Sequence, residues 1–125
     1  MRADTNALAP GASSPVPDET MQGLLASTAP CHAFLLRKGP AYDDPATQPL
    51  QWEHARNMFT LMRDGHLRYV CALMDGTDVV GFGVMNGASR EAVEPLLRAD
   101  PAVRAGRLVW QLMSGMAFNA GETRF

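Results

Sequence analysis

The chain has 125 residues and a mass of 13.5 kDa, the size of one domain, and its 46% hydrophobic content is enough for one packed core. Its 11 lysines and arginines against 13 aspartates and glutamates give a formal net charge of -2 and a pI of about 5.8. This balance excludes a typical nucleic-acid-binding protein, which carries a basic face that neutralises phosphates.

Residues 1–30 are rich in proline, alanine, glycine, serine and threonine, with prolines at positions 10, 15, 17 and 30. Such a composition buries too little apolar surface to offset the conformational entropy of the chain. We therefore expect a flexible N-terminal arm over 1–30, with one short helical turn at 19–26.

The first strand is predicted at 31–38, CHAFLLRK, where three large apolar residues are contiguous, and the proline-rich loop that follows ends it. A helix is predicted at 50–64 because apolar residues recur there with helical spacing. The expected apolar positions are Trp52, Ala55, Met58, Phe59 and Met62. Gly65 ends this helix, since glycine suits the left-handed conformation that follows many helices.

Two further strands, 66–74 and 79–85, flank the polar turn DGTD and predict a β-hairpin. Cys71 lies among apolar neighbours in the first of these strands, so we expect it in the core. Gly81 and Gly83 leave one face of the second strand without side chains. That gap is either a ligand pocket or room for a bulky neighbour such as Trp110, and we favour the packing role.

A second helix is predicted in ASREAVEPLLRAD, with Ser89 as its N-cap and apolar residues at positions 92, 93, 96 and 97. Pro95 is expected to kink or shorten it, because proline lacks a backbone N–H. Asp100 precedes Pro101, which disfavours helical angles and ends the helix. A last strand follows at 107–116.

These elements give the order β-α-β-β-α-β of a ferredoxin-like α+β sandwich, with a four-stranded antiparallel sheet and two helices on one face. The predicted strands are apolar on both faces, and two helices can cover only one. We expect the open sheet face to pack on a second copy of the chain or to line a cavity, and we predict a homodimer. The domain is placed at 31–118, followed by a C-terminal tail at 119–125.

Two segments, EHARNMFTLMRDG and ASREAVEPLLRADPAVRAG, resemble the YciI-like (YCII-related) family of dimeric α+β barrel proteins, and the resemblance covers roughly residues 31–118. The most specific parts are the histidine that begins the first helix, the Ser-x-Glu-Ala start of the second, and DPAVRAG. The chain departs from the family where members carry a Gly-Pro pair in or after the second strand, since it has ALMDGTD there, and in its longer arm.

The resemblance implies an active-site dyad of His54 and Asp100. A carboxylate that is hydrogen-bonded to one ring nitrogen fixes the tautomer of a histidine and leaves the other nitrogen to move a proton. The resemblance also implies lyase or isomerase chemistry on a small metabolite, and one branch of the family is associated with dehydrochlorination of chlorinated hydroxyquinols. The alternatives are a non-catalytic ligand-binding module and a purely structural dimer.

The residues themselves leave a simpler interpretation open, in which His54 is a surface helix residue and Asp100 caps or turns the chain before Pro101. Asp100 is also expected near the C-terminal end of the second helix, where the helix dipole disfavours a carboxylate unless a cation such as protonated His54 compensates.

The remaining candidate ligands have simpler interpretations as well. His32 and His66 lie at strand ends, and a ligand role is the less common one for such residues. The histidines and cysteines show no recognised metal-ligand spacing, so we expect neither a metal nor another cofactor. Cys31 and Cys71 are the only cysteines and are expected as free thiols. Without a signal-peptide or membrane-spanning apolar run, the sequence predicts a cytoplasmic protein that does not bind membranes.

Overall fold

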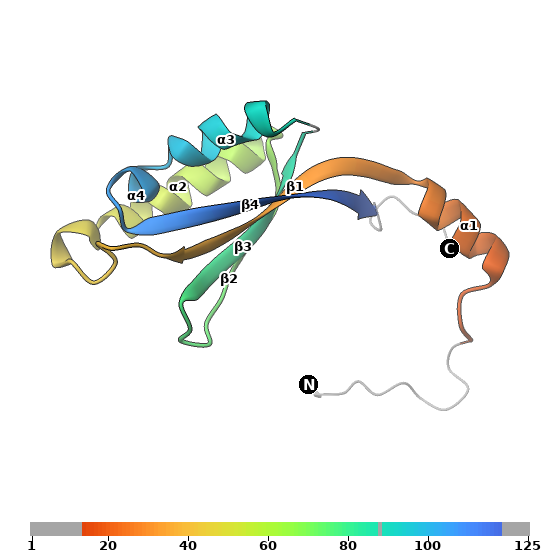
Figure 1. Ribbon diagram of the computed structural model, residues 1–125, viewed down its shortest axis with the longest axis horizontal. Coiled ribbons are helices and arrows are strands. Elements are labelled where there is room, and N and C mark those ends of the chain that lie inside the picture. The colour runs from red at the N-terminus through yellow and green to blue at the C-terminus, as the bar shows by residue number, and fades with distance from the viewer. Residues whose placement is uncertain (1–13, 88, 119–125) are drawn as a thin grey trace. The chain divides into compact units, whose positions relative to one another are not determined.

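The computed structural model describes residues 14–87 and 89–118 (Figure 1). The chain divides into two compact units, one of Ala29–Ala117 and one of the two terminal segments. The terminal unit contains α1 (Asp18–Ala26), which confirms the expected helical turn, and none of the residues of α1 is buried. Residues 28–30, which were predicted to belong to the flexible arm, are part of the first strand, β1 (Thr28–Lys38), so that the strand begins before the predicted boundary at 31. Residues 1–13 of the predicted arm and the predicted tail, 119–125, lie outside the described residues.

The unit Ala29–Ala117, called the core unit below, has a ferredoxin-like α+β fold, as predicted. Its four-stranded antiparallel sheet has the order β2-β3-β1-β4, and the helices α2, α3 and α4 lie on one side of the sheet (Figure 1). In chain order the elements are β1 (Thr28–Lys38), the 3-10 helix η1 (Pro45–Thr47), α2 (Leu50–Arg63), β2 (Leu67–Ala72), β3 (Val79–Asn86), α3 (Arg90–Arg98), α4 (Pro101–Arg104) and β4 (Leu108–Phe118).

The hydrophobic core lies between the sheet and the helices. It includes Phe34, Leu36, Met58, Leu61, Leu67, Met85, Val93, Leu97, Leu108 and Leu112. Gly83 faces this core, and a Cβ placed there would overlap the ring of Phe34 and lie 2.8 Å from the carbonyl oxygen of Tyr69. The glycine is therefore a packing residue, as favoured above, but the bulky neighbour is Phe34 rather than Trp110.

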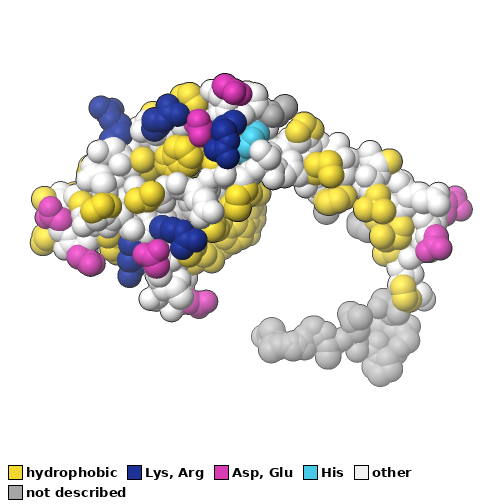
Figure 2. Space-filling view, viewed as in Figure 1, with side chains coloured by type: hydrophobic (Ala, Val, Ile, Leu, Met, Phe, Trp, Pro, Cys, Tyr) yellow, Lys and Arg dark blue, Asp and Glu magenta, His cyan; other side chains and the backbone are white. Residues whose placement is uncertain are grey.

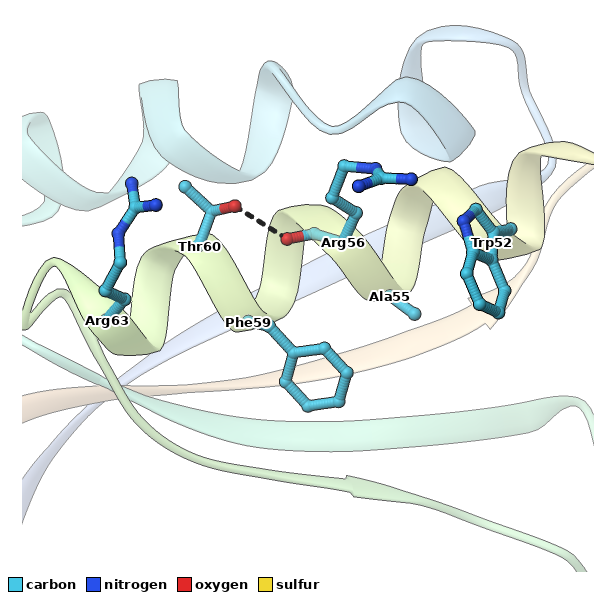
Figure 3. Close-up of a pocket in the computed structure, with 6 residues that line it drawn as sticks. All are labelled: Trp52, Ala55, Arg56, Phe59, Thr60 and Arg63. Carbon is cyan, nitrogen blue, oxygen red and sulfur yellow. Dashed lines mark hydrogen bonds between the residues drawn. The ribbon is translucent and has the colours of Figure 1, made fainter.

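The buried face of α2 differs from the predicted one. His54, Met58 and Leu61 are its buried residues, whereas Trp52 is 71% exposed and Phe59 66% exposed. The three buried positions form one stripe at i, i+4 and i+7, and a histidine takes the first of them. The prediction, which followed the spacing of the apolar residues, is correct for Met58 but is wrong for Trp52 and Phe59. Figure 3 shows the aromatic side chains of Trp52 and Phe59 projecting from the same side of α2.

The second helical region also contains an element that was not predicted. Ser89 caps α3 as expected, since its Oγ accepts a hydrogen bond from the backbone N–H of Ala92 at 3.1 Å. The helix continues past Pro95 to Arg98, and a separate short helix, α4, then begins at Pro101. The Asp-Pro pair therefore ends one helix and starts another, because proline suits the first turn of a helix, where its missing N–H needs no partner.

The other side of the sheet, called the open face below, is largely apolar. Strand alternation and the pairing of β1, β2 and β3 place on it Ala33, Leu35, Tyr69, Cys71, Phe82, Val84, Val109 and Met113. The rings of Tyr69 and Phe82 are 5.9 Å apart on it. Cys71 is only half-buried, so the prediction that it belongs to the core is wrong, and Cys31 is the buried cysteine.

On the side of the molecule that Figure 2 shows, lysine and arginine side chains lie among aspartate and glutamate side chains rather than in a separate basic patch. None of the helices in the described part of the chain is long and apolar enough to cross a membrane.

Candidate active site

The fold brings His54 and Asp100 into direct contact, although 46 positions separate them in the sequence. His54 lies in the first turns of α2, and Asp100 lies between α3 and α4. The Nδ1 atom of His54 is 2.8 Å from Oδ2 of Asp100. Both side chains are buried, since His54 is 7% exposed and Asp100 is 1% exposed. The pair that the family resemblance implied is therefore present as a buried hydrogen bond.

Asp100 also accepts hydrogen bonds from three other groups. Its Oδ2 accepts one from Nδ2 of Asn57 at 2.9 Å, and its Oδ1 accepts from the backbone N–H groups of Ala102 at 2.9 Å and Val103 at 3.4 Å. The carboxylate is therefore the N-cap of α4. The sequence predicted that the carboxylate is disfavoured by the dipole at the C-terminal end of α3 unless a cation compensates. The structure corrects this expectation, because the N–H groups at the start of α4 also stabilise the carboxylate by hydrogen bonds. The capping role and the contact with His54 coexist.

These contacts set the charge of Asp100. Burial alone would raise its pKa, but the hydrogen bond and positive charge of His54, with the hydrogen bonds from Asn57 and Ala102, outweigh burial and hold the pKa of Asp100 below its ordinary value of 3.8. Asp100 is thus ionised at neutral pH and can only accept hydrogen bonds. The hydrogen between the two residues must then be on Nδ1 of His54. In the neutral imidazole, the lone pair is consequently on Nε2.

His54 lines a pocket of about 490 Å³ between α2 and the β2–β3 hairpin. Its walls are mainly apolar, with Met58 and Phe59 from α2, Val70 from β2, and Val80 and Gly81 from β3 among the lining residues. Within residues 14–87 and 89–118, no group forms a hydrogen bond with Nε2 of His54. The volume is within the range of small-molecule sites, which are mostly apolar with a few polar groups. Nε2 is therefore the ring atom left for a bound molecule.

Arg107 is a pocket residue that the sequence did not indicate. It is 7% exposed, and it begins the segment leading into β4, directly after Gly106. Its NH1 atom donates to the carbonyl oxygen of Tyr42 at 2.8 Å, and its Nε donates to Oε1 of Gln51 at 3.3 Å. The guanidinium carbon lies 4.4 Å from the centre of the Tyr42 ring. The only sequence feature that could have indicated a role for Arg107 is its position directly after the DPAVRAG segment. Arginine is usually exposed, so its burial cannot be predicted without knowledge of the tertiary contacts.

A second hollow, of about 410 Å³, lies on the outer surface of α2 and is formed by this helix alone (Figure 3). Its lining residues are Trp52, Ala55, Arg56, Phe59, Thr60 and Arg63. It contains two arginines but no histidine or carboxylate, so it offers no general base. The acid/base candidates are in the pocket of His54.

The other histidines do not join the site. His32 is buried, with Nδ1 3.0 Å from the carbonyl oxygen of Gly87 and Nε2 3.4 Å from Oγ of Ser114, so the protein itself occupies both ring nitrogens. His66 is exposed, in the turn before β2. Among the described residues, no group of three or more histidine, cysteine, aspartate or glutamate side chains is placed to hold a metal ion.

The chain matches no protein-family model, and no curated protein is significantly similar to it in sequence. The functional interpretation therefore depends on the geometry of the site, namely a buried histidine anchored on a carboxylate at the edge of an apolar pocket.

Proposed function

We propose that this protein is a small acid/base enzyme of the lyase or isomerase type, in which His54 moves a proton on a small metabolite. One observation carries the proposal: Asp100 holds Nδ1 of His54 at 2.8 Å, while Nε2 has no partner among the described residues and His54 lines a pocket of about 490 Å³. A histidine held in one tautomer by a carboxylate is a common arrangement for general acid/base catalysis. His54 is the proposed catalytic residue, and Asp100 is its positioning residue.

The proposed chemistry uses side chains of this chain alone. Nε2 accepts a proton from a carbon next to a carbonyl group, and the electron pair of the broken C–H bond forms an enolate. The carboxylate of Asp100 stabilises the resulting imidazolium through the Nδ1 hydrogen bond. Return of the proton to a different atom completes an isomerisation, whereas loss of a leaving group such as chloride from the adjacent carbon completes an elimination. Both routes need one base in a pocket from which most water is excluded.

We further propose that the protein is a YciI-like protein and a homodimer that associates through its open face. The ferredoxin-like fold and the contact between His54 and Asp100 are consistent with what the sequence resemblance implied. The apolar open face supports association, because large apolar patches commonly mark interaction sites. Both cysteines are free thiols, which supports a reducing compartment such as the cytoplasm.

A non-catalytic ligand-binding or structural dimer module is the second candidate function. The observation that favours it is the capping of α4, since Asp100 accepts from the backbone N–H groups of Ala102 and Val103 whether or not His54 moves a proton. In that case the buried pair of His54 and Asp100 would only stabilise the fold.

Exchange of carbon-bound hydrogen in D₂O tests the proposal. Small enolisable carbonyl compounds and halogenated aromatic compounds are incubated with the protein, and proton NMR records the loss of the signal of the exchanging hydrogen. We expect exchange or elimination with the wild-type protein and with His66→Gln, a matched change at an exposed histidine outside the pocket. We expect neither with His54→Gln. Binding of a compound without any reaction would favour the ligand-binding module instead.

A further inference from the structure

The guanidinium of Arg107 is a buried cation that has no carboxylate partner among residues 14–87 and 89–118. Arginines and lysines are rarely this buried unless they are paired with an opposite charge, because removing a charge from water is costly. Nevertheless, the partners of Arg107 within the described chain are neutral: a carbonyl oxygen, an amide oxygen and the face of an aromatic ring. The charge of this side chain is thus hydrogen-bonded in part but not neutralised.

The guanidinium also keeps donors free. An arginine has five N–H donors, and the hydrogen bonds to Tyr42 and Gln51 use one on NH1 and one on Nε. Among residues 14–87 and 89–118, no acceptor bonds to NH2, which leaves the side chain able to bind a planar acceptor such as a carboxylate. Stacking on the Tyr42 ring restricts the guanidinium, so little further entropy is lost when an anion binds.

The backbone of Arg107 is fixed from two directions. Its N–H donates to the carbonyl oxygen of Ala102 at 2.9 Å, and its own carbonyl oxygen accepts from the N–H of Gly39 at 2.8 Å. Ala102 is in the short helix that Asp100 caps. The same local structure therefore positions both the carboxylate that holds His54 and the arginine.

The basic side chains that line the pocket favour an anion, whereas the ionised carboxylate of Asp100 is bonded to Nδ1 of His54 and is not among the lining residues. In the described part of the chain, the lining residues include no aspartate or glutamate, and their only basic groups are Arg107 and His54. The remaining lining is mainly aliphatic and aromatic side chains. Gln51, which accepts from Nε of Arg107, precedes His54 by three positions on α2, so the partner of the guanidinium and the imidazole lie on the same face of this helix.

From these observations we infer that Arg107 is the anion-binding residue of the pocket and that the pocket takes a small organic carboxylate with an apolar body. The carboxylate lies on the free N–H groups of the guanidinium, and the apolar body lies against the aliphatic and aromatic walls. As a substrate class this inference rests on the proposed function, because it places the reacting carbon of such a molecule near His54. As a binding property it stands separately.

Calorimetric titration with benzoate tests the binding property, with benzamide as its neutral counterpart of nearly the same shape and acetate as the same anion without the apolar body. The titrations are made at about pH 8, where histidine side chains are ordinarily neutral. We expect the wild-type protein to bind benzoate at least about tenfold more tightly than either benzamide or acetate. Equal affinities for benzoate and benzamide, or no benzoate binding by the folded protein at millimolar concentration, would overturn the inference.

Variants of Arg107 test whether this side chain, rather than the rest of the protein, causes the preference for benzoate. Arg107→Met is expected to abolish the preference for benzoate over benzamide. Arg107→Lys keeps the charge without the planar donors and is expected to retain part of this preference. It also provides a second test in case Arg107→Met does not fold. Arg56→Gln, a change at an exposed arginine of the same domain, is expected to leave the preference unchanged. Circular dichroism confirms that each variant is folded.

His54→Gln distinguishes this inference from the proposed function. We expect this variant to keep the preference for benzoate while it loses hydrogen exchange in D₂O. Loss of the preference in His54→Gln would assign the anion selectivity to the histidine and overturn the role of Arg107. Intact selectivity in a wild-type protein that exchanges no substrate hydrogen would instead leave the arginine site standing and contradict the enzyme proposal.

Discussion

Removal of the Asp100 side chain is expected to be one of the most destabilising changes in the core unit. The carboxylate is 1% exposed and accepts hydrogen bonds from His54, Asn57, Ala102 and Val103. Breaking a buried charged pair by removing one partner costs about 3–5 kcal/mol, and the lost cap accounts for about 1 kcal/mol of that. Asp100→Asn keeps one oxygen that can cap α4, so we expect it to cost about 1 kcal/mol less than Asp100→Ala.

Urea unfolding monitored by circular dichroism at neutral pH measures these costs. Asp64→Ala is the control, because Asp64 pairs with Arg63 at the surface, and exposed pairs contribute little to stability. A loss below about 1 kcal/mol for Asp100→Ala would refute the reasoning, since it would mean that the buried donors find other partners without cost.

Acid sensitivity provides a second check on the same residue. The pKa of Asp100 is lower in the folded protein than its ordinary value of 3.8, so its ionised form stabilises the fold. This contribution is complete above about pH 4 and disappears as the pH falls through the folded pKa. The stability difference between the wild-type protein and Asp100→Asn should therefore shrink below about pH 4. A difference that is constant from neutral to strongly acidic pH would contradict the assignment.

Three further predictions concern the packing and the open face. Met58→Ala is expected to destabilise the protein by about 2–5 kcal/mol and Phe59→Ala by no more than about 0.5 kcal/mol, because Met58 is buried and Phe59 is exposed. Urea unfolding measures both losses. A larger loss for Phe59→Ala than for Met58→Ala would contradict the assignment of Met58 to the buried face of α2. Gly83→Ala is expected to lower the free energy of unfolding by about 1–3 kcal/mol, because the added Cβ overlaps the Phe34 ring. Gly23 has open space around it, so Gly23→Ala should not destabilise the protein in the same assay. Leu35→Glu places a charge in the open face and is expected to convert the proposed homodimer to a monomer in sedimentation velocity; a wild-type protein that sediments as a monomer would remove the dimer proposal.

Local sequence signals were sufficient to predict the four strands and the helices α2 and α3 in their correct order. Apolar runs bounded by turn residues predicted the strands, and Ser89 and Gly65 marked the start of α3 and the end of α2, where Ser89 caps with its side chain and Gly65 has a φ of +83°. These features act within a few residues of one another, so they can be recognised without tertiary information.

Features that depend on tertiary contacts were missed or mistaken. Hydrophobicity favoured Phe59 and Trp52 as core residues of α2, but a buried histidine with a carboxylate partner takes a core position instead. The helix α4 has four residues, too few for a periodic pattern, and Asp-Pro is also a typical helix stop. Burial of Arg107 depends on Tyr42 and Gln51, which are distant in sequence. The contact between His54 and Asp100 was likewise predicted from the family resemblance, because their spacing in the sequence does not indicate a contact.

The tautomer of His54 is the most direct test of the account. Long-range ¹H–¹⁵N correlation spectra of the histidine side chains at about pH 8 distinguish a hydrogen on Nδ1 from one on Nε2. We predict that His54 is locked with its hydrogen on Nδ1 in the wild-type protein and loses this preference in Asp100→Asn, while the exposed His66 gives the same pattern in both proteins. A His54 with its hydrogen on Nε2 in the wild-type protein would contradict the account, because the nitrogen left for a bound molecule would then carry no lone pair to accept a proton.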